Sequence, residues 1–323
     1  MVLLGVSRSG TTLLKEMLDH HQDLAIPTES YFISQLWDRH GASPDPEQFA
    51  SDIGRLPRVR EWGVSPADVR ERLPAEPTFD EAIQAVYRAY ADRRGKPRYG
   101  DKTPAYMQRL NVLERAFPDA RYVHLLRDGR DAALSFVAMR RRPRFNWARP
   151  RGVGAFAAQW RREVEAARRF GRERAAGRYR ELRYEDLVTE PRASLRAVCE
   201  FLGLEFDHAM LDYHRNDDPK LLVDHPRLAE PPTTEVRRWR DQMAPRDAEL
   251  FEAIAGRLLT ELGYERAYPQ PSIAARANAT LQRMMLAARI ALWDAALLLA
   301  RKSPAWRLRQ IYTRRTFKEG TTP

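Results

Sequence analysis

The sequence has little cysteine and no long hydrophobic run. Cys199 is the only cysteine among 323 residues, which excludes an internal disulfide, a disulfide framework and a metal site made of thiolates alone. The first five residues, MVLLG, lack a basic stretch and are too short an apolar run for a secretory signal. We therefore expect a cytoplasmic protein in a reducing compartment.

Lysine is also scarce, and the excess positive charge is spread unevenly. The chain has 55 Lys or Arg residues and 44 Asp or Glu residues, a formal net charge of +11, but only six lysines. Ten of the basic and two of the acidic residues lie in 272–323, so this segment carries +8 and residues 1–271 carry +3. Such a tail favours an anionic surface, lipid headgroups or nucleic acid, or serves only solubility.

Apolar runs alternate with helical patterns along residues 1–271. Runs typical of buried strands occur at residues 2–6, 24–26, 99–100, 122–126 and 179–182. Helical patterns separate them, at residues 11–20, 105–116, 130–141, 154–170 and 191–202. Strands that alternate with helices predict an α/β fold with a central parallel sheet flanked by helices.

Two segments depart from this alternation. Residues 31–97 are interrupted by prolines and contain no clear strand, so we expect a helical insertion over the carboxyl edge of the sheet, where ligands bind in such folds. Pro269 and Pro271 mark the end of the main domain, residues 1–271, and residues 272–323 form a C-terminal helical tail. Its helical pattern is too short and too charged for a membrane span.

A glycine-bearing loop, GVSRSGTTLL, follows the first predicted strand at residues 5–14. A strand, a glycine loop and a helix in this order direct backbone N–H groups and a positive helix end toward an anion. The spacing of Gly5 and Gly10 matches a P-loop, but Thr11 stands where the Walker lysine would be. We predict a sheet like that of P-loop NTPases and a phosphate site with Arg8 as its cation. A tight turn before a helix cap is the alternative.

This loop resembles the 5′-phosphosulfate loop of sulfotransferases that use 3′-phosphoadenosine 5′-phosphosulfate (PAPS). A second segment, YVHLLRDGRD at residues 122–131, resembles the family's 3′-phosphate site, in which an arginine and a serine eight residues later bind the phosphate; here they are Arg127 and Ser135. The layout is similar to bacterial members and to tyrosylprotein sulfotransferases. An ion pair between Arg127 and Asp131 is the alternative for this motif.

The resemblance implies a cofactor and the residues that bind it. The cofactor is PAPS, and adenosine 3′,5′-bisphosphate is its product. Tyr184 resembles the family's tyrosine near the adenine, and Arg238, beside Trp239, resembles a basic residue that closes over the nucleotide. The implied cofactor-binding residues are Arg8, Ser9, Gly10, Thr11, Thr12, Arg127, Ser135, Tyr184 and Arg238.

Sulfuryl transfer needs cations around the transferring oxygens, a base for the acceptor proton and exclusion of water. We predict Glu29 as the base, because it follows the predicted strand 24–26 and lies 21 residues after Arg8, similar to tyrosylprotein sulfotransferases. Arg8 and Lys102 are the predicted catalytic cations; the position of Lys102 resembles a family lysine that contacts the sulfuryl group. The alternatives are a helix-capping Glu29 and a surface Lys102 paired with Asp101.

Histidine and metal chemistry fit the sequence poorly. The cytosolic branch of the family uses a histidine base; His124 lies inside a predicted strand as a structural imidazole would, and His40, in the insertion, stays open as a base. No pair of His or Cys has the spacing of metal ligands, so we predict no metal. A P-loop-type small-molecule or nucleotide kinase, which would need ATP and Mg²⁺, is one alternative function. A non-catalytic membrane- or nucleic-acid-binding protein is the other.

The sequence leaves the acceptor and the role of the tail open. A hydroxyl or amine of a lipid, glycan, peptide tyrosine or small molecule would serve as acceptor, and we expect the insertion to select it. We expect no nucleic-acid partner. Residues 272–323 either lie on anionic lipid, which would place the protein peripherally at the inner face of the membrane, or pack on the body or a homodimer partner, or stay disordered.

Overall fold

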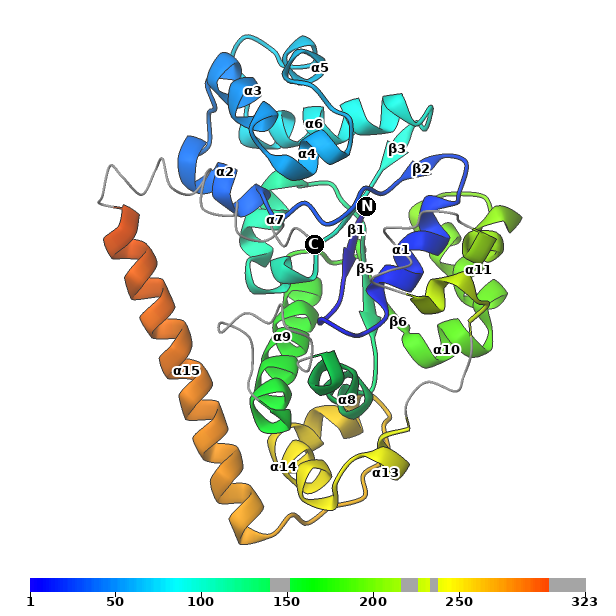
Figure 1. Ribbon diagram of the computed structural model, residues 1–323, viewed down its shortest axis with the longest axis vertical. Coiled ribbons are helices and arrows are strands. Elements are labelled where there is room, and N and C mark those ends of the chain that lie inside the picture. The colour runs from blue at the N-terminus through cyan, green and yellow to red at the C-terminus, as the bar shows by residue number, and fades with distance from the viewer. Residues whose placement is uncertain (140–151, 216–225, 233–237, 302–323) are drawn as a thin grey trace, which may run out of the picture.

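A four-stranded parallel sheet forms the centre of the computed structural model, which describes residues 1–139, 152–215, 226–232 and 238–301 (Figure 1). Its strands, in spatial order, are β4 (Asp101–Lys102), β1 (Val2–Leu4), β5 (Tyr122–Leu126) and β6 (Tyr179–Arg183). All neighbouring pairs are parallel, and β1 and β5 are buried along their whole length. Parallel strands buried in this way need helices on both faces, which confirms the predicted α/β fold.

Helices account for most of the remaining chain. Those beside the sheet are α1 (Thr11–Asp19), η1 (Pro104–Gln108), α7 (Leu110–Ala116), α8 (Gly129–Met139), α9 (Val153–Glu173), α10 (Tyr184–Thr189), α11 (Pro191–Leu202) and α14 (Pro245–Glu261). Shorter elements complete the C-terminal half: η2 (His208–Arg215), η3 (Pro226–Ala229) and α13 (Trp239–Gln242).

The two faces of the sheet belong to two hydrophobic clusters, because side chains alternate along a strand. Leu3, Val123 and Leu125 pack in one cluster with α1, α10 and α11. Val2 and Tyr122 pack in the other, with α7, α9 and α14. Helices therefore cover both faces, with α1 and α11 on one side of the sheet and α7 and α9 on the other (Figure 1).

Two strands that we expected in the central sheet form a separate one. β2 (Leu24–Ala25) pairs in parallel with β3 (Arg98–Tyr99) and not with the central strands, so the placement of residues 24–26 in the main sheet was wrong. Gly100 alone separates β3 from β4. A Cβ at Gly100 would lie 2.7 Å from the Met1 sulfur and 3.2 Å from the Ile26 side chain, so a larger residue here would require these side chains to shift. The chain thus passes from the small sheet directly into the edge of the large one.

The insertion consists of helices, as the sequence predicted. They are α2 (Ile33–His40), α3 (Pro46–Gly54), α4 (Pro57–Glu61), α5 (Pro66–Glu71) and α6 (Phe79–Arg93). α3, α4 and α5 each begin with proline in the first turn, where its missing N–H costs nothing. These helices stand at one end of the molecule, above β2 and β3 (Figure 1).

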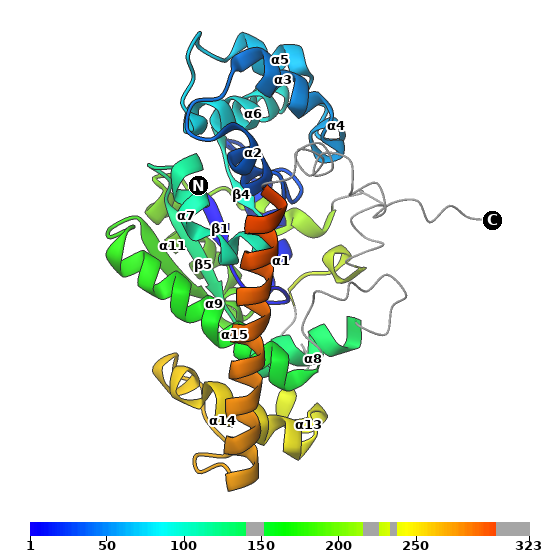
Figure 2. The same cartoon turned by 90° about the vertical axis from the view of Figure 1, so that its left-hand side faces the viewer.

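The last described helix, α15 (Ile273–Arg301), packs against α9 and α14 and runs from the level of α14 to about the level of α2 (Figure 2). The preceding helix, α14, ends before Gly263, whose φ of 76° is the left-handed conformation expected of a glycine at a helix end. Across the described ranges, no helix combines the length and the apolar character that a membrane crossing requires. Residues 302–323 lie outside the described part.

Candidate active site

The loop between β1 and α1 requires glycine at its last position. Gly10 has a φ of 90°, and a Cβ there would lie 2.4 Å from the Tyr184 ring. α1 begins after Gly10 without a side-chain cap and without an acidic residue in its first turn. The N–H groups of Thr11 and Thr12 therefore lack intrahelical partners at a positive helix end, an arrangement that favours a bound anion. The Ser9 N–H differs, because it donates to the Val6 carbonyl at 3.1 Å.

Arg8 joins this loop to the second predicted phosphate motif. Its Nε donates to the Ser135 Oγ at 3.1 Å, and its carbonyl oxygen accepts a hydrogen bond from the Arg127 guanidinium at 3.2 Å. Arg8 has a φ of 74°, a conformation that costs a non-glycine residue on the order of 1 kcal/mol. The two contacts hold this backbone in place, and three residues predicted to bind one nucleotide thereby meet.

Tyr184 forms a wall of the same cluster. The Arg127 guanidinium carbon lies 4.3 Å from the centre of the Tyr184 ring, and both side chains are buried. Arg127 follows β5 and Tyr184 follows β6, so the carboxyl ends of neighbouring parallel strands deliver both residues to one edge. Arg127 does not form the alternative helical ion pair, because its described contacts are the Arg8 carbonyl and this ring.

Glu29 and Lys102 form an ion pair next to the start of α1. The Lys102 Nζ lies 2.7 Å from Glu29 Oε1 and donates to Thr12 Oγ1 at 3.4 Å. The Lys102 side chain is 5% exposed, whereas that of Glu29 is 26% exposed. Asp101 is not the partner of Lys102: it points to the other side of β4, where Tyr87 and Ser30 donate to it at 2.6 and 2.9 Å.

Tyr31 is a site residue that sequence analysis missed. Its hydroxyl donates to Glu29 Oε2, so Lys102 and Tyr31 hold different oxygens of one carboxylate. The backbone of Tyr31 has a φ of 56°, which turns the chain back toward Glu29 at the start of the insertion. Neither its residue type nor its spacing in the sequence marks this role.

Asp131, also missed, connects α8 to the segment around Arg238. Its carboxylate accepts a hydrogen bond from the Trp239 N–H at 2.8 Å. Burial and the neighbouring Asp128 raise the pKa of Asp131 to about 7. Trp239 packs under the Arg130 guanidinium, 3.7 Å from the ring centre, and Arg238, which is exposed, stands directly before α13. Arg237 lies outside the described residues.

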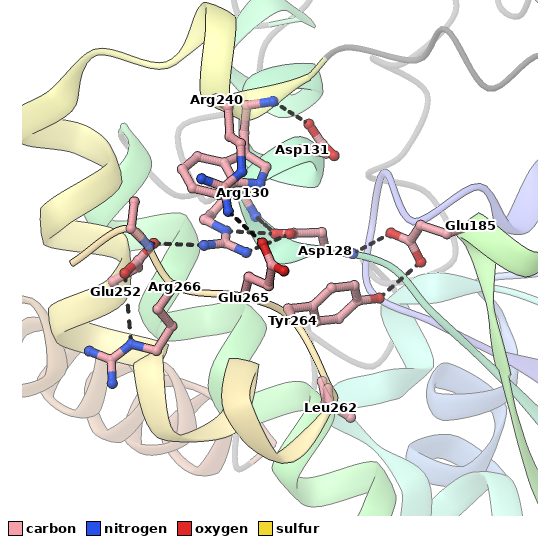
Figure 3. A network of polar contacts seen from close by, with 12 residues as sticks. Asp128, Arg130, Asp131, Glu185, Arg240, Glu252, Leu262, Tyr264, Glu265 and Arg266 are labelled. Carbon is pink, nitrogen blue, oxygen red and sulfur yellow. Dashed lines mark hydrogen bonds and ion pairs between the residues drawn. The ribbon is translucent and has the colours of Figure 1, made fainter. Parts of the chain in front are cut away.

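A polar network holds together the segments that carry Arg127 and Tyr184 (Figure 3). Arg130 binds Asp128 at 2.7 Å and Glu252 at 2.6 Å, which ties α8 to α14. Glu185 accepts hydrogen bonds from the Asp128 N–H and the Tyr264 hydroxyl, both at 3.0 Å. These bonds fix the start of α10, from which the Tyr184 ring projects.

The histidines stand apart from this cluster. Burial lowers the pKa of His124 to about 3, and its ring contacts the Tyr179 hydroxyl at 2.5 Å, so it is the structural imidazole that the sequence predicted. His40 lies 3.1 Å from Asp52 and against Phe49, inside the insertion. Among the described residues, no three His, Cys, Asp or Glu side chains are grouped as metal ligands.

A cavity of about 480 Å³ lies elsewhere, at the opposite edge of the strands. Met1, Tyr99, Arg121 and Leu202 are among the residues that line it. None of the predicted site residues does so. The candidate site is therefore defined by its converging charged groups and not by this cavity.

Comparison with known proteins gives a family and distant relatives. A family model described as "Sulfotransferase family" matches residues 1–208. Protein-tyrosine sulfotransferase 1 of Danio rerio is 25% identical over 278 residues, which cover 81% of this chain and 71% of that protein. The human protein of the same name is 26% identical over 217 residues, covering 65% of this chain and 52% of its own. The chain spans about half the length of several such relatives.

Solved structures show the same architecture. The sulfotransferase domain of the Synechococcus PCC 7002 olefin synthase matches with a TM-score of 0.56 and 25% identity, over 82% of this chain and 94% of that one. A sulfotransferase domain from the curacin biosynthetic pathway has the same TM-score at 19% identity, over 82% and 98%, and supports the fold alone. The family match ends at residue 208, so it contains Arg8, Glu29, Lys102 and Arg127 but not Arg238.

Proposed function

The chain belongs to the sulfotransferase family, and we propose that it transfers the sulfuryl group of PAPS to a hydroxyl or amine acceptor. One observation carries this proposal: two motifs predicted to bind anions, 119 positions apart, meet through Arg8 and Arg127, and the Glu29–Lys102 pair touches the same loop through Thr12. Family membership argues against both alternative functions, a kinase and a non-catalytic binding protein. The chain also lacks the Walker lysine that a kinase of this type would need.

The chemistry of the cluster fits a nucleotide with two anionic ends. The first turn of α1 and Arg8 would hold the phosphosulfate, and Arg127 with Ser135 would hold the 3′-phosphate. Tyr184 would border the adenine, and Arg238 would approach from the start of α13. When bound, PAPS supplies a sulfuryl group attached to a phosphate leaving group. The protein then has to provide cations, a base and a dry site.

Glu29 would accept the proton of the acceptor. Its carboxylate is 26% exposed, so an acceptor can reach it, and its two oxygens are held by Lys102 and Tyr31. A carboxylate oriented in this way presents a fixed lone pair to the hydroxyl or amine. Lys102 would also place its positive charge beside Thr12, at the loop where negative charge develops during transfer.

Isothermal titration of the 323-residue chain with adenosine 3′,5′-bisphosphate tests the nucleotide site. We expect saturable binding by the wild type and a loss of roughly tenfold or more in affinity for Arg127→Ala, which removes a charged donor. Arg257→Gln, at an exposed position on α14, is the matched control and should bind like the wild type. Preference for ATP with Mg²⁺ over this nucleotide would contradict the proposal.

Transfer of label from PAPS to a panel of acceptors tests the other half of the reaction. Because the relatives above are named protein-tyrosine sulfotransferases, peptides containing tyrosine are the first candidates, followed by glycans, lipids and small phenols. We expect label in one class and none in the others. If the protein bound the nucleotide but labelled none of these classes, the proposed donor site would stand and these acceptor classes would be refuted.

A further inference from the structure

The outer face of α15 is the most apolar exposed surface in the described part of the chain. All five large hydrophobic side chains that are exposed there lie on this helix, with exposed fractions from 53% to 79%: Ile273, Leu281, Met284, Met285 and Leu292. Figure 2 shows the helix running from the level of α14 to about the level of α2. Single exposed hydrophobic residues are ordinary, but a group on one helix marks an interaction surface.

The opposite face of α15 is already occupied by the body of the protein. Ala275 and Ala279 are buried, and Leu286 packs against the core cluster that includes α9 and α14. Ala275, Ala279 and Leu286 follow one another at spacings of one and two helical turns, so they share one face of the helix. Leu281 and Met285 project from the other face of the same helical turns, and this face therefore remains for a partner.

Positive charge borders the outer face of α15. Arg276 and Arg283 are exposed beside the apolar stripe, and Arg289 reaches back to Gln159 of α9 at 3.4 Å. No Asp or Glu occurs between residues 273 and 293. An apolar stripe with arginine borders is typical of helices that lie in the interface of an anionic membrane.

We propose that the outer face of α15 binds an anionic lipid surface. Leu281, Met284, Met285 and Leu292 enter the boundary between headgroups and acyl chains, and Arg276 and Arg283 contact the anionic headgroups. Charge complementarity selects lipid over a second copy of the chain. Residues 273–301 contain four arginines and one acidic residue, Asp294, so two copies packed along this helix would bring two positively charged stretches together.

Flotation of the 323-residue protein with vesicles tests the proposal. We expect it to float with vesicles of phosphatidylcholine and phosphatidylserine in equal parts, and not with phosphatidylcholine alone. Binding should weaken strongly at about 1 M salt, where the screening length falls to about 3 Å. Absence of flotation with the anionic vesicles at low salt would overturn the proposal.

Two pairs of substitutions separate the apolar and the charged contributions. Met284→Gln with Met285→Gln keeps helix-forming side chains of similar size and should lower vesicle affinity roughly tenfold or more, because it removes the apolar insertion. Arg276→Gln with Arg283→Gln should lower affinity for the anionic vesicles by a similar factor. Arg257→Gln removes an exposed arginine from α14 and should change nothing.

Sedimentation equilibrium distinguishes the competing occupant. We expect a monomer for the wild type and for the double methionine variant, with unchanged circular dichroism for both. A wild-type dimer that the methionine substitutions convert to monomer, together with equal flotation of both proteins, would assign the face to a second copy and refute the lipid surface.

Discussion

Two carboxylate–cation pairs of this protein have nearly the same length and contrasting surroundings. Glu29 and Lys102 approach to 2.7 Å with 26% and 5% of their side chains exposed. Glu252 and Arg130 approach to 2.6 Å with 0% and 1% exposed. Glu252 also accepts hydrogen bonds from the Ala267 and Tyr268 N–H groups at 3.0 and 2.7 Å.

The contrast teaches what distinguishes a reactive pair from a structural one. Glu252 is fully buried and bound by Arg130 and two backbone N–H groups, so it joins α8, α14 and the chain before α15. Glu29 is held by two groups as well, but it stays partly accessible next to the predicted phosphate loop. Accessibility and neighbourhood, and not the ion pair itself, mark the candidate base.

The largest expected effect is on catalysis at Glu29. Glu29→Gln keeps the shape and loses the proton acceptor, so we expect turnover to fall roughly 10²–10⁴-fold. Affinity for adenosine 3′,5′-bisphosphate should stay near the wild-type value, whereas the free energy of unfolding should fall, because the buried Lys102 loses its charged partner. The measurement is label transfer from PAPS, beside nucleotide titration and urea unfolding. A parallel loss of nucleotide affinity would remove the distinction between the base and the binding residues.

A substitution in the buried pair of Glu252 and Arg130 should affect the stability of the fold instead of catalysis. Glu252→Ala leaves Arg130 and two backbone N–H groups short of an acceptor, and we expect it to lower the free energy of unfolding by about 3–5 kcal/mol. Glu265→Ala, at a site 88% exposed and paired with Arg240, should cost less than about 1 kcal/mol. Urea unfolding measures both. If Glu252→Ala proved as stable as Glu265→Ala, the network would not have the structural role described.

A smaller effect on turnover is expected at Tyr31. Tyr31→Phe removes the hydroxyl that holds Glu29 Oε2, and we expect turnover to fall about tenfold without a change in nucleotide affinity. Tyr99→Phe is the matched control, because its hydroxyl bonds to Gln84 at 3.0 Å, away from Glu29. Equal rates for the two variants would mean that Lys102 alone orients the carboxylate.

The pH dependence of stability at Asp131 is a further test of how burial affects a carboxylate. Asp131 has a pKa of about 7 in the folded protein, whereas in the unfolded chain it loses its proton above about pH 4. The folded protein therefore binds the additional proton between about pH 4 and about pH 7, and its stability falls as the pH rises through this range. Asp131→Asn cannot titrate and still accepts from the Trp239 N–H. We expect the variant to gain about 1–2 kcal/mol over the wild type between about pH 5 and about pH 8, measured by urea unfolding. A pH-independent difference would contradict the raised pKa.

The fold was predictable where sequence signals are long and local. β5 and α11 have the predicted bounds, because a five-residue apolar run and a helix between Pro191 and Gly203 each carry their own start and stop. β2 and β3 were assigned to the wrong sheet, since a two-residue strand contains too little pattern to choose its neighbours. The family resemblance supplied the candidate site residues, and the structure brought most of them together.

The sequence could not indicate two of the contacts at the site, one between distant segments and one local contact that needs an unusual backbone conformation. The bond from the Trp239 N–H to Asp131 spans 108 positions, and the one from Tyr31 to Glu29 depends on a left-handed backbone at a tyrosine. Neither has a spacing or residue type that recurs as a motif. The first contact follows from how the helices pack around the sheet, and the second follows from the backbone conformation of Tyr31.

The joint at Gly100 has a consequence for how an acceptor is sensed. α6 of the insertion leads into β3, and a single residue then separates β3 from the strand that ends in Lys102. Because this connection is so short, we expect a displacement of the insertion to shift β4 and Lys102 with it. If the insertion contacts the acceptor, as the sequence led us to expect, acceptor binding and the position of Lys102 would then be coupled through the backbone.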